Sequence, residues 1–401
     1  MAVTSAQTDR SPWRTFGPVA GLFVLSAAAA AYEIAPASVV PLVRASLGVG
    51  PTAAGWLVSV MYATAVITSV PAGVVLERLP VRRAVVGAGV ALLVAGAWGW
   101  YAAVAGSFWL LLASRLLGGI AYVLVWNAGA SLAGQVVRSD LRATAVGVFT
   151  ASAPVGFALG QFASPLIAAP FGWPAILPAY GTLGVVGVAV FLVTTRGTAF
   201  EIESGSPDRA AFVDLFENRA MWTLSTLCFL AFSLYLFLNS WLPSYLTTEL
   251  DVSLALGGVL TALFPAVGVV SRISGGVFSD RLFGGRRRPV ALLSFGLAAP
   301  TIAAFTLVDR LAVVVALVVV AGFAVQLAIG LLFSYVTEVV EPEVGATAVS
   351  VLTSVGLFGA FLAPIVAGRV IDAAGYRPAF LLGTAVSLVG VAVAWRAPRT
   401  G

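Results

Sequence analysis

The 401-residue chain is 60% hydrophobic and only 10% charged, with a mean hydropathy of +1.02, whereas a soluble domain carries roughly 25% charged residues. This composition excludes a soluble globular protein, and the absence of His together with a single cysteine, Cys228, argues against a metal site and an internal disulfide framework. The net charge of +5 comes from 22 basic residues, all of them Arg and mostly placed between apolar runs, which favours orientation in a membrane over binding to nucleic acid.

Twelve apolar runs follow one another, each close to the roughly 20 residues that cross about 30 Å of hydrocarbon. Residues 1–16 are polar, and the first run after them resembles a signal peptide, but the repeat described below requires it as the first helix. The charged stretch 197–219 is predicted to be a cytoplasmic linker between an N-terminal bundle, residues 1–196, and a C-terminal bundle, residues 220–401. The runs lie near residues 17–40, 52–75, 84–105, 107–131, 143–168, 174–195, 220–246, 253–276, 289–308, 311–335, 346–371 and 378–396.

The two halves repeat each other at a fixed offset. Gly73–Arg83 and Gly276–Arg288 are Arg-rich segments between apolar runs, and they begin 203 positions apart (276 − 73 = 203). At the same offset, Ala143–Val146 and Ala346–Val349 both read Ala-Thr-Ala-Val. Because six predicted helices separate the copies, both copies have the same orientation in the membrane. The sequence therefore predicts an all-α membrane protein with twelve transmembrane helices in two pseudo-symmetric six-helix bundles.

The distribution of Arg predicts the orientation. Most Arg residues fall in segments on the same side as the N-terminus, and the opposite side holds Arg44, Arg310, Arg369 and Arg377. Positive charge is retained on the cytoplasmic side of a membrane. We therefore expect a multi-pass protein of the plasma membrane with both termini in the cytoplasm.

Each Arg-rich segment contains a glycine followed by a carboxylate–arginine pair at its helix end. The residues are Gly73, Glu77, Arg78 and Arg82 in the first segment and Gly276, Asp280 and Arg281 in the second. They resemble the hinge signature of the major facilitator superfamily, roughly G-x-x-x-D-R-x-G-R-R after helix 2, although Glu77 replaces Asp and Pro80 replaces Gly in the first copy. Arg115-Leu-Leu-Gly-Gly119 is similar to the helix 4 signature of the same family.

The resemblance covers the whole chain and implies transport by alternating access, with a central cavity lined by helices 1, 4, 7 and 10. It also implies a gating role for the seven hinge residues, which lock the cytoplasmic side in that family. Contacts that form in one state and break in the other bias a bistable packing. The alternative is that these charges only end helices and set the topology.

Two charges lie well inside predicted spans, Glu33 in the first helix and Arg115 in the fourth. An ionisable group at the centre of a bilayer costs about 2.5–3.5 kcal/mol. At 1.5 Å per residue, both lie roughly 10–12 Å from the outer ends of their helices. The matching depth predicts a Glu33–Arg115 pair that serves proton coupling, and the alternative is a structural ion pair that ties two helices together.

Further polar and aromatic side chains on the expected cavity helices predict a moderately polar substrate site. They are Tyr32, Tyr122, Trp126, Asn127, Tyr235, Asn239 and Gln326. One cation, one acid and several rings suit a small organic or inorganic anion, or an amphipathic compound. Arg272 lies outside this set and is interpreted as a snorkelling side chain or a partner of Glu338.

Three hypotheses follow for the function. The first is a secondary active transporter, a symporter or antiporter coupled to protons. The second is a uniporter or anion exchanger in which Arg115 binds substrate, and the third is a transporter-like sensor that moves nothing. An enzyme is not expected, because the sequence has no nucleophile–base set, metal cluster or phosphate loop. We expect a monomer whose partners are a small-molecule substrate, the lipid bilayer and protons, with no nucleic acid, cofactor or metal.

Overall fold

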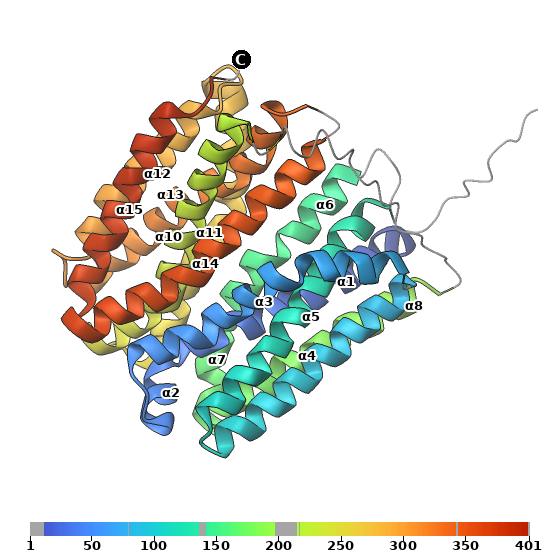
Figure 1. Cartoon of the computed structure of the whole chain (residues 1–401). Helices are drawn as coiled ribbons and strands as arrows, with labels where there is room; N and C mark the ends of the chain where they lie inside the picture. The colour runs from blue at the N-terminus through green and yellow to red at the C-terminus, as the bar shows by residue number, and fades with distance from the viewer. Residues whose placement is uncertain are drawn as a thin grey trace, which may run out of the picture.

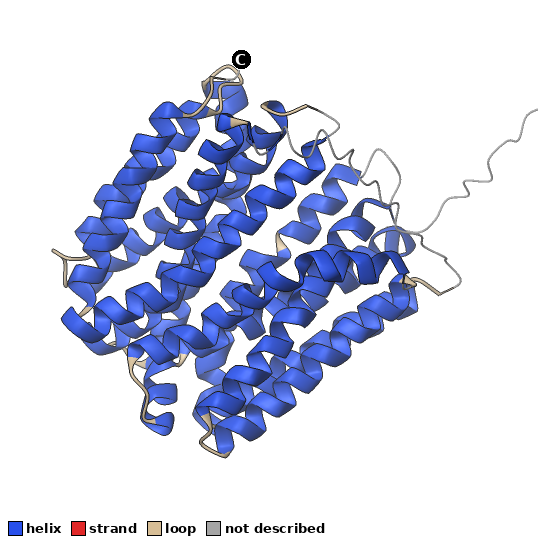
Figure 2. Ribbon diagram, viewed as in Figure 1, coloured by secondary structure: helices blue, strands red, loops and turns tan. Residues whose placement is uncertain are grey.

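The computed structural model describes residues 12–78, 80–135, 142–196, 215, 217–341 and 344–399. Within these ranges the chain is helical, and no strand occurs (Figure 2). The N-terminal bundle contains α1 (Pro12–Ser38), α2 (Val40–Leu47), α3 (Pro51–Arg78), α4 (Val81–Val104), α5 (Phe108–Gln135), α6 (Arg142–Thr150), α7 (Ser152–Phe171), the 3-10 turn η2 (Trp173–Ala175) and α8 (Ile176–Thr194). The C-terminal bundle contains α10 (Arg219–Glu249), α11 (Leu254–Leu282), α12 (Arg288–Ala304), α13 (Leu311–Glu338), α14 (Gly345–Ala374) and α15 (Tyr376–Arg396).

The helices lie in two groups, blue to green and yellow-green to red (Figure 1). In the part of the chain that is described, 11 helical segments are long and apolar enough to cross a membrane, with α6 and α7 counted as one. The twelfth, α12, is apolar and has 17 residues. The predicted fold class is confirmed. The predicted limits of the linker stay a prediction, because residues 197–214 and 216 lie outside the described residues.

The first and last residues of several helices show the same 203-residue repeat as the sequence. α5 begins and ends 203 positions before α13 (311 − 108 and 338 − 135), and α6 with α7 spans the range that lies 203 positions before α14 (345 − 142 and 374 − 171). Two turns repeat at the same offset, since Gly172 and Gly375 have φ of 78° and 83°, and Gly48 and Asp251 have φ of 63° and 51°. Asp is one of the few side chains that tolerate this left-handed region. The backbone geometry of the turns was therefore duplicated with the helices.

Two local features differ from the sequence-based expectation. The predicted loop after the first span contains the short helix α2. Pro36 and Pro41 each remove a helical donor, so the chain breaks at Val39 and restarts. The predicted hinges are also partly helical, because α3 continues to Arg78 and α11 to Leu282. Helix-breaking residues come only later, at Pro80 and at Gly284 and Gly285, which have positive φ.

We call the end that carries α2 and the α4–α5, α10–α11 and α12–α13 turns the α2 end (Figure 1), and the opposite end, where α8 stops and α10 starts, the linker end. The bundles are joined toward the α2 end. Thr52 at the start of α3 donates from its backbone N and its Oγ1 to Asp372 Oδ2 of α14, at 3.0 and 2.5 Å. The buried core of the C-terminal bundle also extends over α1 and α3, where it includes Ile34 and Val58.

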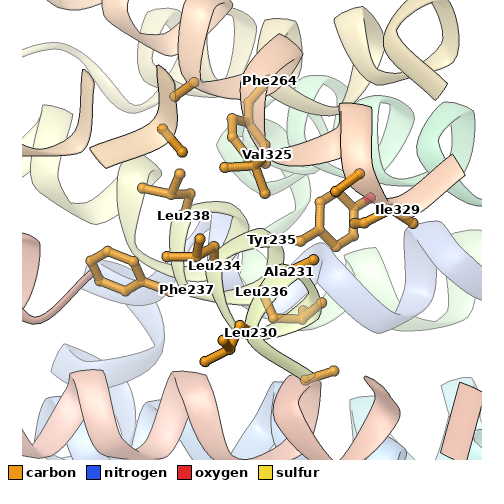
Figure 3. Close-up of a cluster of buried hydrophobic side chains, with 14 of the residues drawn as sticks. Leu230, Ala231, Leu234, Tyr235, Leu236, Phe237, Leu238, Phe264, Val325 and Ile329 are labelled. Carbon is orange, nitrogen blue, oxygen red and sulfur yellow. The ribbon is translucent and has the colours of Figure 1, made fainter. Parts of the chain in front are cut away.

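α10 is buried on all sides along most of its C-terminal half, from Leu234 to Leu246. Figure 3 shows Leu234, Tyr235 and Phe237 of this helix among side chains from α11 and α13, including Phe264 and Val325. A helical stretch that is buried on every side belongs in the interior of a large protein. α10 therefore lies at the centre of the molecule, where it contacts α1 of the other bundle.

Candidate functional site between the two bundles

Arg115 of α5 is fully buried and binds three backbone carbonyl groups. Its Nε donates to Leu57 O of α3 at 2.8 Å, its Nη1 to Tyr32 O of α1 at 2.7 Å, and its Nη2 to Glu33 O. Pro36 explains one of these acceptors. It has no N–H, so the carbonyl four residues earlier, Tyr32 O, has no helical donor. Arg115 supplies the missing donor and ties α1, α3 and α5 together.

The prediction of a Glu33–Arg115 ion pair is wrong, because no salt bridge joins these two side chains, both of which the structure describes. Arg115 reaches Glu33 through the main chain. Equal depth in the membrane was the basis of the prediction, but each guanidinium nitrogen has a backbone carbonyl acceptor, two of them on α1 and one on α3. The side chain stabilises the N-terminal bundle through three of its five N–H donors, one on each guanidinium nitrogen.

The Glu33 carboxyl is directed elsewhere. The side chain is 1% exposed, and its Oε1 has no hydrogen-bond partner among the described residues. The Tyr62 phenol of α3 interacts with the carboxyl. A buried carboxyl oxygen without a partner is costly. Such an atom is a candidate position for a proton, water or substrate.

Tyr235 of α10 stands between the bundles. Its ring stacks on Phe157 of α7, with ring centroids 5.4 Å apart, and on Phe264 of α11, at 6.0 Å. Its buried hydroxyl lacks a well-formed hydrogen bond to the described residues. The stacking fixes the ring, while the phenol O–H remains available to a ligand.

Arg272 of α11 lies beside Tyr235. Its guanidinium carbon is 5.4 Å from the centre of the Tyr235 ring, within the range of a cation–π contact. Its Nε is buried and without a partner in the described part of the chain. The interpretation of Arg272 as a partner of Glu338 is wrong, because Glu338 pairs with Arg287 at 2.8 Å.

These residues form what we call the central polar cluster. Its members come from five helices of both bundles and are Glu33, Tyr62, Tyr122, Tyr235 and Arg272. The Tyr122 ring packs against the cores of both bundles. The cluster combines one cation, one acid and three phenols in a region where buried polar atoms lack partners. It can bind a small polar solute and transfer a proton.

The other predicted cavity residues have different surroundings. Tyr32 is buried inside the N-terminal bundle, where its ring lies 4.5 Å from the Arg115 guanidinium and its hydroxyl donates to Ala95 O. Gln326 donates to Phe264 O and Gly322 O within the C-terminal bundle. The Oε1 of Gln326 is buried without a partner among the described residues. The role of Tyr32 and Gln326 in lining the cavity stays a prediction.

The three remaining predicted cavity residues are Trp126, Asn127 and Asn239. Trp126 stacks on Tyr122 at 6.3 Å and also contacts Phe149. Asn127, next to Trp126 on α5, is half-buried. Asn239 is buried and takes part in a contact between the bundles. Their contact with substrate remains a prediction.

The hinge residues that are described lie within single bundles. Arg287 Nη1 binds Asp280 at 2.8 Å, and its Nε and Nη2 bind Glu338, so this network joins α11 to α13. The hydrogen bond that Arg287 donates to the Glu338 carboxylate raises the pKa of Arg287. Arg82 donates to Leu192 O of α8 at 3.4 Å. The two remaining described hinge residues, Gly276 and Arg281, lie on α11 with open space and solvent around them.

The side chains of the first hinge copy, Gly73, Glu77 and Arg78, lie outside the described residues. In this conformation the second hinge fixes the linker end of one bundle. A gating role for either hinge stays a prediction.

Sequence reasoning missed Tyr62, the cluster role of Arg272, and Gln161. A signal existed for two of them, because Tyr62 is the single phenol of α3 and Gln161 the single amide of α6 and α7. Polar side chains in a membrane span are costly and mark functional positions. For metals, the described residues contain no group of three or more His, Cys, Asp or Glu that could hold an ion.

Comparison with known families bears on the whole chain. The model of the Major Facilitator Superfamily matches residues 21–364 and 275–400. The chain belongs to this family. The match agrees with the predicted family, and the long apolar helices agree with a multi-pass membrane protein.

The proteins similar to it include two relatives and one solved structure. The nitrite extrusion protein of Bacillus subtilis is 25% identical over 247 residues, 60% of each chain. The cis,cis-muconate transport protein of Acinetobacter baylyi is 25% identical over 281 residues, 65% of each chain. The alignments thus span less than two thirds of these relatives.

A bacterial homolog of the human lysosomal transporter Spinster, in an inward-facing and unoccupied conformation, matches with a TM-score of 0.81. It is 18% identical and covers 97% of this chain and 98% of that chain. This likeness concerns the fold.

Proposed function

We propose that the protein is a secondary active transporter that moves a small anion between the two bundles by alternating access. The main support for this proposal is the environment of Arg272. Its guanidinium lies beside Tyr235, where the two bundles meet, and its Nε is buried without a partner among the described residues. A guanidinium offers planar, paired donors to carboxylates and other oxyanions. In the second intramembrane cation, Arg115, every guanidinium nitrogen already donates to a backbone carbonyl group, which disfavours the alternative in which Arg115 binds substrate.

Two further observations support an anion. The relatives named above are a nitrite extrusion protein and a muconate transport protein, and nitrite and muconate are both anions. The phenols of Tyr62, Tyr122 and Tyr235 add hydrogen-bond donors and ring faces around the cation. Glu33 is proposed as the proton-coupling residue, because its carboxyl belongs to the same cluster.

The test is uptake into proteoliposomes, with nitrate and cis,cis-muconate as probes. Nitrate is suitable because it is the anion of a strong acid and does not follow a pH gradient by itself. We expect Arg272→Met to reduce uptake at least about 100-fold, as expected for the loss of a charged partner worth about 3 kcal/mol. Arg286→Met, on the exposed loop before α12, is the matched control and should keep uptake. Equal uptake by Arg272→Met and the wild type would contradict the proposal. A transporter-like sensor would instead bind the probes without flux.

The proposed orientation places the linker end in the cytoplasm, which follows from the asymmetry of Arg between the two sides. A reporter fused at Gly205 or after Arg399 should be cytoplasmic, and one inserted at Asp251 should be external. Accessibility of the reporters to a membrane-impermeant reagent decides this. An external reporter at Gly205 is the contrary outcome. With this orientation, the conformation described here is closed to the outside.

A further inference from the structure

We propose that Gln161 is a positioning residue that holds the α2 end closed and connects this closure to the central polar cluster. The proposal rests on the alternating-access function proposed above, and it concerns a contact that joins the two bundles directly. Gln161 lies on α7 of the N-terminal bundle and is fully buried. Its Nε2 donates to Asn239 Oδ1 at 2.9 Å and to Asn239 O at 3.2 Å, both on α10 of the C-terminal bundle.

The second acceptor exists because of a proline. Pro243 has no N–H, so the carbonyl four residues earlier, Asn239 O, lacks its helical donor. Gln161 supplies a donor from the other bundle. When the bundles are together, this carbonyl is satisfied within the protein. When they separate at the α2 end, water in the opened space can replace the amide.

The backbones also approach closely at this crossing. Pro165 leaves the Gln161 carbonyl without a helical donor, and Gly258 of α11 packs against that oxygen. A Cβ at Gly258 would lie 2.6 Å from it. A side chain at this position would therefore hold α7 and α11 apart. The glycine permits the approach that brings the Gln161 amide to Asn239.

Asn239 transmits the contact toward the cluster. Its Nδ2 donates to Tyr235 O at 2.8 Å, one helical turn earlier. The Tyr235 ring stacks on Phe157, which lies on α7 one turn before Gln161. The two bundles thus meet at two successive turns, Gln161 on Asn239 and Phe157 on Tyr235. Opening the α2 end must separate both pairs, and the second pair includes a member of the central polar cluster.

Loss of the Gln161 amide should destabilise the closed state selectively. In Gln161→Met the side-chain volume is similar, but Asn239 O and Oδ1 remain buried without a donor as long as the bundles are together. An unsatisfied buried acceptor costs enough to change the ratio of open to closed molecules by about tenfold. Gln326→Met is the matched control, because Gln326 donates to Phe264 O and Gly322 O inside one bundle.

The experiment measures the distance between spin labels at Ala45→Cys and Leu307→Cys in nanodiscs, in a Cys228→Ala background. Both label sites are exposed at the α2 end, one on each bundle. No substrate is needed, so failure here is separate from failure of the proposed anion transport. We expect Gln161→Met to raise the population with the longer distance about tenfold, and Gln326→Met to leave the distribution unchanged even if it lowers the melting temperature.

Two further variants make the test decisive. Gln161→Asn withdraws the amide by one methylene and should show the same direction of change if Gln161→Met does not fold. Asp372→Ala removes the Thr52–Asp372 hydrogen bonds between the bundles, which are exposed to water. It should change the population about twofold, as for a weak exposed interaction. A wild-type distance distribution in the folded Gln161 variants would overturn the proposal, and so would an equal change in Gln326→Met.

Discussion

Arg115→Met should cost the protein about 3 kcal/mol or more of stability, because three buried carbonyl groups lose their donors at once. One of them, Tyr32 O, has no helical partner to fall back on, since Pro36 occupies the donor position. We expect a clear drop in melting temperature in detergent together with a low yield of monodisperse protein. Arg115→Lys should lie between the wild type and Arg115→Met, because an ammonium keeps the charge but loses the planar fork that reaches two helices.

Arg272→Met is the internal control for this prediction. Both positions are Arg within membrane spans, so the substitutions remove the same charge and a similar volume. Arg272 makes a ring contact, and its Nε has no partner among the described groups. Its removal therefore eliminates the free-energy cost of burying the charge and leaves no backbone carbonyl without a donor. We expect a melting temperature equal to that of the wild type or higher. Similar losses of stability in both variants would contradict the assignment of Arg115 as the structural cation and Arg272 as the functional one.

The fold could be predicted from the sequence to within a few residues for most helices, because each span must bury about 20 apolar residues in the bilayer. The repeat gave independent support, since an offset read from two Arg-rich segments also relates the bounds of α5 to α13. α2 could not be predicted from hydropathy. It depends on Pro36 and Pro41, which interrupt an apolar stretch that otherwise continues.

The site was less predictable, because hydropathy gives the depth of a residue but not its direction around the helix axis. Glu33 and Arg115 share a depth, yet the guanidinium turns to backbone carbonyl groups and the carboxyl turns toward Tyr62. Pro36 was the available signal. Because proline has no N–H, the carbonyl four residues earlier, Tyr32 O, lacks its helical hydrogen bond and can accept one from a side chain. The position of Arg272 beside Tyr235 depends on how α10 and α11 pack, which no single-helix pattern contains.

Glu33→Gln should abolish accumulation driven by a pH gradient while leaving exchange or downhill flux measurable. Glutamine has the shape of the protonated carboxyl but cannot release a proton. Proton coupling needs a carboxyl that is ionised in one state and protonated in the other. Glu33 can change its surroundings between the states, because Tyr62 belongs to its own bundle and Tyr235 to the opposite one. Opening of the α2 end would separate Glu33 from Tyr235 and admit water to the carboxyl.

The measurement uses nitrate in proteoliposomes, first with an imposed pH gradient and then in exchange for nitrate inside. For Glu33→Gln we expect gradient-driven accumulation to fall to the level of liposomes without protein, and exchange to stay within about tenfold of the wild type, an effect of about 1.4 kcal/mol on the transport barrier. Glu341→Gln makes the same chemical change at an exposed position and should retain both activities. Full accumulation by Glu33→Gln would exclude Glu33 as the proton site and favour anion exchange without protons. Loss of exchange as well would instead assign Glu33 to substrate binding, since coupling and binding differ only in whether flux survives without a gradient.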